Sequence, residues 1–197
     1  LAFELLRTVC ILSLRKKTYE AVHKELREIL RNIEEVYRPR MRRLFDEDIR
    51  VFRLVSANRI LRDAAVTPTE RDRYNRVALR HQRTATTVPI QICETAFEAL
   101  ELAIRVYDIG FKSARGDSGV AISNLLSSVS GSLFIVFLNL KSFRRGKWLR
   151  DTRKVAELLA GRFSQSQRDA FRKVIELYQE SLKDADQQLN FDFLNRD

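Results

Sequence analysis

The chain contains few of the residues that end helices, with six glycines and three prolines among 197 residues. A fold of many short strands needs more turn residues than this, so we do not expect an all-β protein. Leu, Arg, Glu and Ala dominate the sequence, and all four residue types favour helices. With 45% apolar residues the chain can bury a core, which excludes disorder and collagen-like structure. We therefore expect an all-α fold in a single domain.

Residues that bind metals or form disulfides are also scarce. The chain has two cysteines, Cys10 and Cys93, and two histidines, His23 and His81, and none of them belongs to a C-x-x-C or Cys/His cluster. We therefore expect no metal site and no secreted disulfide scaffold, and we expect a cytoplasmic protein. The sequence also has no Gly-rich phosphate loop, no nucleophile elbow and no HExxH motif.

The charge is one-sided, because 36 basic residues against 26 acidic residues give a net charge of +10. This excess favours anionic partners, although most of the arginines alternate with acidic residues as they do on solvated helix faces. Basic clusters occur at residues 15–17, 38–43 and 144–154. These clusters contain no recognisable reading motif with interleaved aromatic residues, so we do not expect direct binding of nucleic acid.

No charged residue occurs between Asp117 and Lys141, and this segment is long enough to span a bilayer. Its many serines and its strongly charged neighbours favour the central buried helix of a bundle instead, so we expect no membrane partner. Ser123, Ser127 and Gly131 follow one another at four-residue spacing. Such small residues allow close approach of another helix, either inside the protomer or across a two-fold axis.

Apolar periodicity and capping signals divide the chain into about six helices without an internal repeat or linker. The expected helices cover residues 1–14, 18–64 with a kink at Pro39, 68–108 with a bend at Pro89, 117–141, 148–162 and 165–194. Thr67 followed by Pro68 is a strong helix start. We expect residues 117–141 to be the most buried segment, with a helical extension from about residue 148 in the same domain, residues 1–197. The chain starts in mid-pattern at Leu1, so we expect a preceding segment.

Three polar residues stand out as candidates for chemistry. Asp48 occupies an apolar stripe position between Leu44 and Phe52, where burial raises a carboxyl pKa towards the range useful for proton transfer. The alternative is a residue at the edge of the stripe that pairs with an arginine. Asp117 is either functional or a helix N-cap. Asn139 must bond either the helix backbone or a ligand. We expect no chemistry from the two histidines.

Several segments in order along residues 1–143 resemble the cyclodeaminase/cyclohydrolase family. This family comprises methenyltetrahydrofolate cyclohydrolases and the cyclodeaminase domain of formiminotransferase-cyclodeaminase. The matching segments are residues 87–90, 97–102, 116–121, Gly131 and 138–140, together with Arg15-Lys16-Lys17, Tyr19 and the Asp48-x-x-x-Phe52 pattern. No single motif is diagnostic of the family, whereas the occurrence of all these segments in the same order and spacing is diagnostic.

The resemblance implies an all-α homodimer that acts in folate one-carbon metabolism, as a methenyltetrahydrofolate cyclohydrolase or a formiminotetrahydrofolate cyclodeaminase. The substrate is then a tetrahydrofolate derivative, and the reaction needs no metal because the bridging carbon is already electrophilic. Asp48 or Asp117 would be the catalytic acid/base, and Asn139 would orient the ligand. Lys16 with neighbouring arginines would bind its anionic groups, and Tyr19 and Phe52 would complete the binding site.

The sequence also departs from the family pattern. The family's Gly-rich turn would lie before Leu1. Its Asn-x-Asn-x-x-Ser-Asp loop corresponds to Phe111, Ser113, Gly116 and Asp117, so only the aspartate is kept, and Ile135 replaces the first Asn of an Asn-Val-x-x-Asn-Leu run. Residues from Trp148 onward have no apparent family counterpart. These departures leave two hypotheses open: a folate enzyme, or a catalytically degenerate member that binds another anionic ligand or a protein partner.

Overall fold

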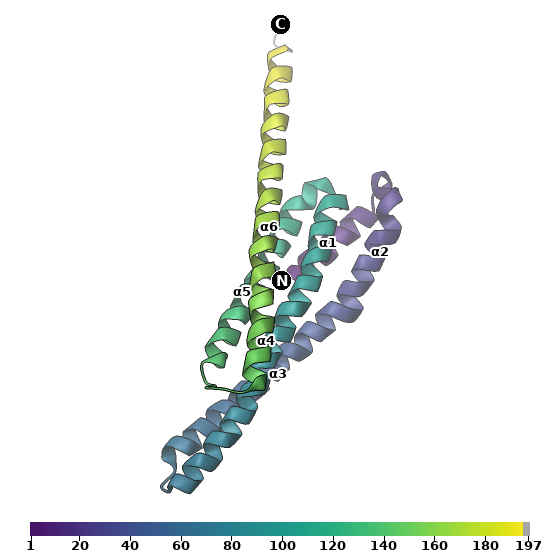
Figure 1. Ribbon diagram of the computed structural model, residues 1–197. Coiled ribbons are helices and arrows are strands. Elements are labelled where there is room, and N and C mark those ends of the chain that lie inside the picture. Colours follow the sequence, from purple (N-terminus) through teal and green to yellow (C-terminus); the bar gives the residue numbers. More distant parts are fainter. Residues whose placement is uncertain (195–197) are drawn as a thin grey trace.

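The computed structural model describes the backbone of residues 1–194 and the side chains of residues 1–183. This part of the chain contains helices and no strand (Figure 1). The α-helices are α1 (Ala2–Leu14), α2 (His23–Asn32), α3 (Arg38–Ala64), α4 (Pro68–Ile109), α5 (Arg115–Leu140) and α6 (Lys147–Leu194). Two short 3-10 helices, η1 (Lys17–Val22) and η3 (Lys112–Ala114), and one π-helical turn, η2 (Ile33–Tyr37), connect them. The all-α prediction with about six helices is confirmed.

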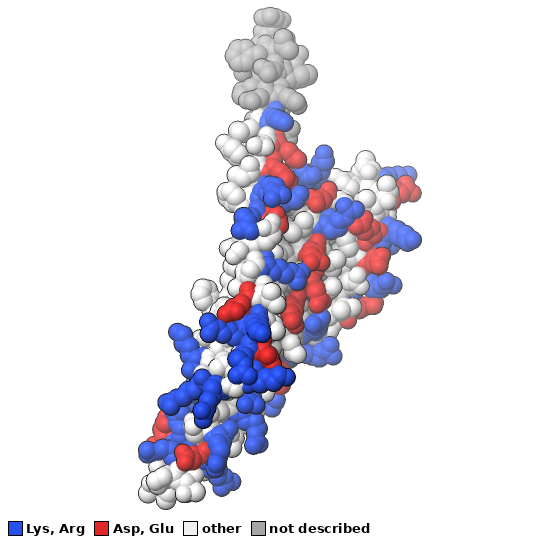
Figure 2. All heavy atoms as spheres, in the orientation of Figure 1, with Lys and Arg blue, Asp and Glu red and all other residues white. Residues whose placement is uncertain are grey.

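The helices α3 and α4 form a long antiparallel hairpin whose tip projects beyond the rest of the bundle (Figure 1). We call residues 53–83 the arm. Lys and Arg side chains crowd the part of the visible surface that the arm and the adjoining α5–α6 turn form (Figure 2). The expected kink near Pro39 takes the form of the π-helical turn η2, which directly precedes α3 and its Pro39. Proline has no N–H group for the helix ladder, which favours such a local irregularity.

The start of α4 follows the sequence prediction closely. The Thr67 Oγ1 accepts the N–H of Glu70 at 3.3 Å, and the Glu70 carboxylate accepts the N–H of Thr67 at 3.3 Å, so the two residues form a capping box. Pro68 occupies the first turn, where its missing N–H has no helical partner to lose.

The second half of α4 is the centre of the core. Its expected apolar stripe is buried throughout: Val88, Ile92, Ala96, Ala99, Ala103 and Val106. Phe97 and Leu100 are also almost completely buried beside it. The expectation that residues 117–141 are the most buried segment is therefore wrong, because α4 is covered by α3 on one side and by α5 on the other.

The helix α5 packs against α1, α4 and α6 with one side only. The other side carries an uncharged stripe that we call the open face of α5: Val120, Ser123, Ser127, Gly131, Phe134 and Leu138. Phe134 is 76% exposed and Leu138 is 64% exposed, and no atom lies within 4 Å of a Cβ built on Gly131. Within the described residues, the small-residue stripe therefore makes no close helix contact inside the protomer.

By length and composition alone, one described helix could cross a membrane. This segment, Lys112–Leu140, consists of η3 and α5, has a mean hydropathy of 1.8 in its most apolar window, and is 39% buried there. Its apolar composition has two structural uses, since one side enters the core and the other forms the open face. The helix α5 starts at Arg115, two residues before Asp117, and no side chain caps it, so the alternative of an Asp117 N-cap is wrong. Asp117 instead lies in the first turn, where a negative charge favours the helix dipole.

The last helix, α6, is continuous where two helices were expected. A single Gly161 is the only helix-weakening residue near the expected break, and one glycine is tolerated inside a helix. Phe171, Ile175, Tyr178 and Leu182, the first residues of its apolar stripe, are exposed. The remaining three, Ala185, Leu189 and Phe193, lie outside the described side chains.

Candidate functional site

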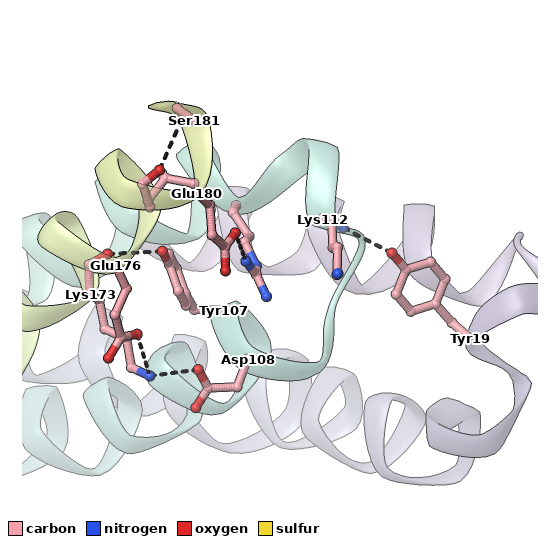
Figure 3. Close-up of polar contacts among 10 residues, drawn as sticks. Tyr19, Tyr107, Asp108, Lys112, Lys173, Glu176, Glu180 and Ser181 are labelled. Atoms are coloured by element: carbon pink, nitrogen blue, oxygen red, sulfur yellow. Dashed lines mark hydrogen bonds and ion pairs between the residues drawn. The ribbon is translucent and has the colours of Figure 1, made fainter. Parts of the chain in front are cut away.

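Three of the expected site residues gather at the end of the bundle where α4 passes into α5. The hydroxyl oxygen of Tyr19 accepts the N–H of Lys112 at 3.0 Å (Figure 3). The Lys16 ammonium lies 4.4 Å from the centre of the Phe111 ring, and Tyr19 meets the same ring edge-on at 6.2 Å. The 3-10 helix η1 thus supports the turn that leads to Asp117, whose carboxylate is exposed.

A hydrogen bond from the turn at Phe111 to Ser13 of α1 holds this turn in place. The Ser13 hydroxyl accepts the N–H of Phe111 at 2.8 Å and donates to the carbonyl of Val9 at 2.7 Å. Gly110 precedes this turn, and a Cβ atom there would lie 2.5 Å from the Val106 carbonyl oxygen. The close approach therefore requires glycine, and the position of the turn is set by backbone packing.

A cavity of about 600 Å³ opens beside this turn, between α4, α5 and α6. Most of its wall is apolar, and its polar groups are those of Tyr107, Arg115, Ser123, Gln167 and Lys173. Apolar walls with a few convergent polar groups are typical of small-molecule binding sites. The cavity lies next to Asp117, because both Gly116 and Gly119 line it.

Arg115 gives the cavity a positive, partly desolvated group. Its side chain is 14% exposed, forms an ion pair with Glu180, and stacks over the Tyr107 ring at 5.3 Å. The Nε atom of Arg115 is buried and has no hydrogen-bond partner among the described residues, and the same holds for the Ser118 hydroxyl. An unsatisfied buried donor is costly, and of these two residues Arg115 lines the cavity, so its guanidinium suits a ligand that offers an oxygen acceptor.

Tyr107 and Lys173 join α6 to the cavity wall. The Tyr107 hydroxyl donates to the Lys173 carbonyl at 3.0 Å, and the Lys173 ammonium lies 2.9 Å from the Asp108 carboxylate (Figure 3). The hydrogen bond to Asp108 raises the pKa of Lys173, and burial raises the pKa of Tyr107. Both groups therefore keep their protons at neutral pH, and Lys173 keeps its charge.

Asp48 lies elsewhere, halfway along α3. Its carboxyl group is half-buried and forms no ion pair among the described residues, although arginines abound on the same helix. Burial raises the pKa of Asp48 above its ordinary value of 3.8. The stripe-edge alternative, pairing with an arginine, is therefore not what the structure contains. Phe52, one turn further along α3, is 66% exposed.

Asn139 bonds a helix backbone, which was one of its two expected roles. Its Nδ2 donates to the carbonyl of Ala85 at 2.7 Å. In a regular helix this carbonyl would accept the N–H of residue 89, but Pro89 has none. Asn139 therefore satisfies the backbone oxygen that the proline inside α4 leaves without its usual partner. A contact of Asn139 with a ligand stays a prediction.

The structure brings these residues together in two groups rather than one. Asp48 lies on α3 between Arg40, which bonds Glu98, and Arg59, which bonds Gln82, and so it is level with the middle of α4. Asn139 contacts the same part of α4. Asp117, Lys16 and Tyr19 lie beyond the end of α4 at Ile109. The helix between Glu98 and Ile109 alone spans about 16 Å at 1.5 Å per residue.

Other candidates for chemistry are inert by comparison. Burial raises the pKa of both Cys10 and Cys93 to about 12, so neither is a thiolate at neutral pH. His23 lies 3.2 Å from the Lys16 carbonyl, and His81 is half-buried on α4. The described residues contain no group of three or more His, Cys, Asp or Glu side chains that could hold a metal ion. Sequence analysis missed Tyr107, Arg115 and Lys173, because nothing in the local pattern joins residues so far apart.

Comparison with known proteins agrees with this fold. Residues 1–158 match the family model of formiminotransferase-cyclodeaminase, so the chain belongs to this family. The crystal structure of formiminotetrahydrofolate cyclodeaminase from Thermotoga maritima is similar to it, with a TM-score of 0.68 and 16% sequence identity. The similarity covers 90% of this chain and 83% of that chain. No curated protein sequence matches the chain.

These matches confirm the family resemblance and change one detail of it. The family match ends at residue 158, past the start of the expected extension at about residue 148. The structural similarity covers 90% of the chain, whereas residues 1–147 make up only 147 of 197 residues. Part of the segment after Trp148 therefore has a structural counterpart, contrary to the expectation. The sequence signal fails there because few residues of this long helix are buried.

Proposed function

We propose that the protein acts in folate one-carbon metabolism as a formiminotetrahydrofolate cyclodeaminase. In this reaction one folate nitrogen attacks the formimino carbon and loses its proton, while the imino nitrogen takes up two protons in all and leaves as ammonia. The product is methenyltetrahydrofolate. Hydrolysis of methenyltetrahydrofolate is the alternative activity, since it uses the same cationic carbon with water as the nucleophile. Both reactions require proton transfer to and from nitrogen or oxygen.

The single observation that carries this proposal beyond family membership is the environment of Asp48. A carboxyl group on a half-buried helix face, without an ion-pair partner among the described residues and with a raised pKa, is suited to accept and return a proton. A carboxylate kept only for stability would instead be paired, because an arginine partner offsets the cost of desolvation. Asp48 is our candidate for the catalytic acid/base, and Asp117 is the second candidate.

The cavity beside Asp117 supports binding of a reduced folate. A pterin and a benzoyl ring are flat and largely apolar, and the glutamate end is anionic. The apolar walls suit the rings, while Arg115 and Lys173 suit a carboxylate. Lys16 lies beside the turn between α4 and α5, over the Phe111 ring, and adds positive charge there. Phe52 and Tyr19 remain candidate ligand contacts.

The open face of α5 supports a homodimer. Its small residues, Ser123 and Ser127, lie at one end, and its large residues, Phe134 and Leu138, lie at the other. In a two-fold pairing of antiparallel α5 helices, each large end would meet the small end of the other copy. The partner's Asp117 would then lie towards Asn139, on the level of Asp48. Two copies would thus bring together candidate groups that lie far apart in one protomer.

The first test is turnover by the purified protein. We expect formation of methenyltetrahydrofolate from formiminotetrahydrofolate, followed by the absorbance of the conjugated amidinium product and by release of ammonia. Methenyltetrahydrofolate in a parallel reaction measures hydrolysis and separates the two activities. If neither substrate is consumed and neither gives heat in calorimetric titration, the proposal of a folate enzyme fails.

The dimer makes a separate prediction. Phe134→Asp introduces a charge into the open face, and we expect it to convert a dimer at micromolar concentration into a monomer, as measured by sedimentation velocity. Leu158→Asp, which places the same charge on a position of α6 that is 75% exposed and does not line the cavity, is the matched control and should leave the dimer intact. A wild-type protein that sediments as a monomer contradicts the dimer. A wild-type protein that can be purified only in detergent or lipid also contradicts it, because the open face would then contact lipid instead of a second copy.

A further inference from the structure

The positive charge of the protein is concentrated at one end. The arm, residues 53–83, and the α5–α6 turn with the start of α6, residues 141–154, together contain 15 of the 36 basic residues and 4 of the 26 acidic residues. The rest of the chain, with 21 basic and 22 acidic residues, is almost neutral. Figure 2 shows this end as a broad field of Lys and Arg side chains. The net charge of +10 therefore belongs to one surface.

This surface contains a cleft between two separate elements. Arg76, Arg80 and Arg83 of α4 form one bank, and Arg144 and Arg145 of the α5–α6 turn form the other. The cleft has a volume of about 800 Å³. A smaller cleft of about 290 Å³ shares Asn75, Leu79 and Ser142 with it and continues to α3. We call the whole the arginine groove: Arg59, Arg62, Arg76, Arg80, Arg83, Arg144 and Arg145.

The arginines on α4 are spaced for a ligand with repeated charges. Arg73, Arg76, Arg80 and Arg83 follow one another at steps of three, four and three residues, so they share one face of the helix. All four side chains are exposed. They place one cation on each helical turn, at intervals of about 5 Å. A chain of anionic groups can run along such a row, whereas a compact ligand would use only one or two of its members.

One acidic residue touches the edge of the groove, since Asp63 pairs with Arg62 at 2.8 Å, and long acid-free segments form the rest. Residues 49–62, 73–93 and 118–150 contain 13 basic residues and no Asp or Glu. Among the described residues, Arg76, Arg80, Arg144 and Arg145 form no ion pair. Arg83 stacks on the Trp148 ring at 5.4 Å, which holds this guanidinium at the wall. Such mutual repulsion persists in a structure only at a free-energy cost, and a bound polyanion would relieve it.

We propose that the arginine groove binds the phosphate backbone of a nucleic acid without reading its bases. Guanidinium groups bond phosphate oxygens in pairs, and phosphate contacts of this kind supply affinity without sequence selection. The expectation from sequence was no nucleic-acid binding, because the basic clusters lack interleaved aromatic residues and a recognisable reading motif, but contacts to phosphates alone need neither. Folding places Arg144 and Arg145 of the cluster at 144–154 beside α4, about one third of the chain away. This proposal is independent of the folate activity.

A flat anionic membrane suits the surface less well. The tip of the arm would have to approach the bilayer first, and it carries Asp63, Glu70 and Asp72. The groove, in which Arg62–Asp63 is the one ion pair among the described residues, lies instead along the flank of the arm, between two elements. A recessed groove fits a strand or the edge of a duplex better than a planar surface.

The test measures binding of fluorescently labelled duplex DNA and single-stranded RNA of mixed sequence by anisotropy at several salt concentrations. We expect binding that does not depend on sequence and that weakens with salt, with a slope of log K against log salt of about −0.9 for each duplex phosphate contacted. The variant R76A/R80A/R144A should bind at least about tenfold more weakly, and its slope should be smaller by roughly three.

The matched control is K24A/R27A/R31A, which removes the same charge from exposed positions on α2 at the other end of the molecule. We expect it to bind within about twofold of wild type, because long-range charge effects are screened within about 10 Å at 0.1 M salt. Circular dichroism melts check that both variants fold, and folate turnover should be the same in both.

Three results would overturn the proposal. Equal weakening in the two triple variants would mean that only net charge matters. Stronger binding to vesicles of anionic lipid than to either nucleic acid would identify the surface as a membrane site. Competition by poly-γ-glutamate at a lower charge concentration than by inorganic polyphosphate would show a preference for carboxylates. A wild-type protein that binds nucleic acid as expected but turns over no folate would contradict the proposed function and leave this proposal intact.

Discussion

Asp48→Asn is expected to lower kcat/KM for the folate substrate by roughly 10²–10⁴-fold, the range typical for loss of a general acid or base. The amide has the shape of the carboxyl group but cannot take up and return a proton. The matched control is Asp46→Asn, which makes the same change on an exposed position of the same helix and should retain full activity. Equal activity in wild type and Asp48→Asn would remove Asp48 from the proposed mechanism.

The same variant has a distinct signature in stability. Because burial raises the pKa of Asp48 above 3.8, the folded state holds this proton more tightly than the unfolded state does. The free energy of unfolding therefore falls as pH rises through the window between 3.8 and the higher folded pKa. Asp48→Asn lacks this loss, so it should be slightly more stable than wild type at neutral pH. The difference should vanish on acidification below 3.8.

Urea denaturation at several pH values separates a functional Asp48 from a structural one. A functional carboxylate gives a large loss of turnover with equal or higher stability at pH 7. A structural ion-pair partner would instead give a less stable variant, since removal of one partner leaves a charge uncompensated. Lower stability in Asp48→Asn at neutral pH would contradict our interpretation of this residue.

Asn139→Ala is expected to lower the free energy of unfolding by about 1–3 kcal/mol, because it leaves the buried carbonyl of Ala85 without a partner. Asn124 is the matched control, since its Nδ2 donates to the Val120 carbonyl of its own helix at 2.8 Å. That carbonyl also accepts a regular helix bond, so Asn124→Ala should change stability by less than about 0.5 kcal/mol. Urea denaturation measures both variants.

A double-mutant cycle with Pro89 tests the cause. Pro89→Ala restores an N–H group that can bond the Ala85 carbonyl along α4. In that background Asn139→Ala should cost less than in wild type, with a coupling free energy of roughly 0.5–3 kcal/mol. Additive effects of the two substitutions would show that Asn139 does not act through the carbonyl that Pro89 leaves free.

The family resemblance itself rested on residues in order along the chain, and the family match over residues 1–158 confirms it. The resemblance could name candidate residues but could not say which of them meet. Lys16, Tyr19 and Asp117 lie at one end of the bundle, while Asp48 and Asn139 lie beside the middle of α4. Their separation depends on the positions along α4 at which α3 and α5 pack, and no short sequence pattern encodes those positions.

What the sequence determined by itself is local. The scarcity of glycine and proline gave an all-α fold, and Thr67, Pro68 and Glu70 placed the start of α4, because capping bonds join residues only three apart. Apolar periodicity indicated where the helices run, because apolar residues recur with the helical turn. It could not show that α4 is covered on two sides and α5 on one, since periodicity does not identify the neighbour.

Tertiary structure alone decided the features on which function depends. Asn139 satisfies a carbonyl 54 residues away, Arg115 pairs with Glu180 65 residues away, and Asp48 stays unpaired among the described residues despite many arginines nearby in sequence. The basic side chains of the arm and those of the α5–α6 turn become neighbours only after folding. Each of these outcomes depends on distances between side chains from different helices, and those distances are set by packing of the whole core rather than by any local preference.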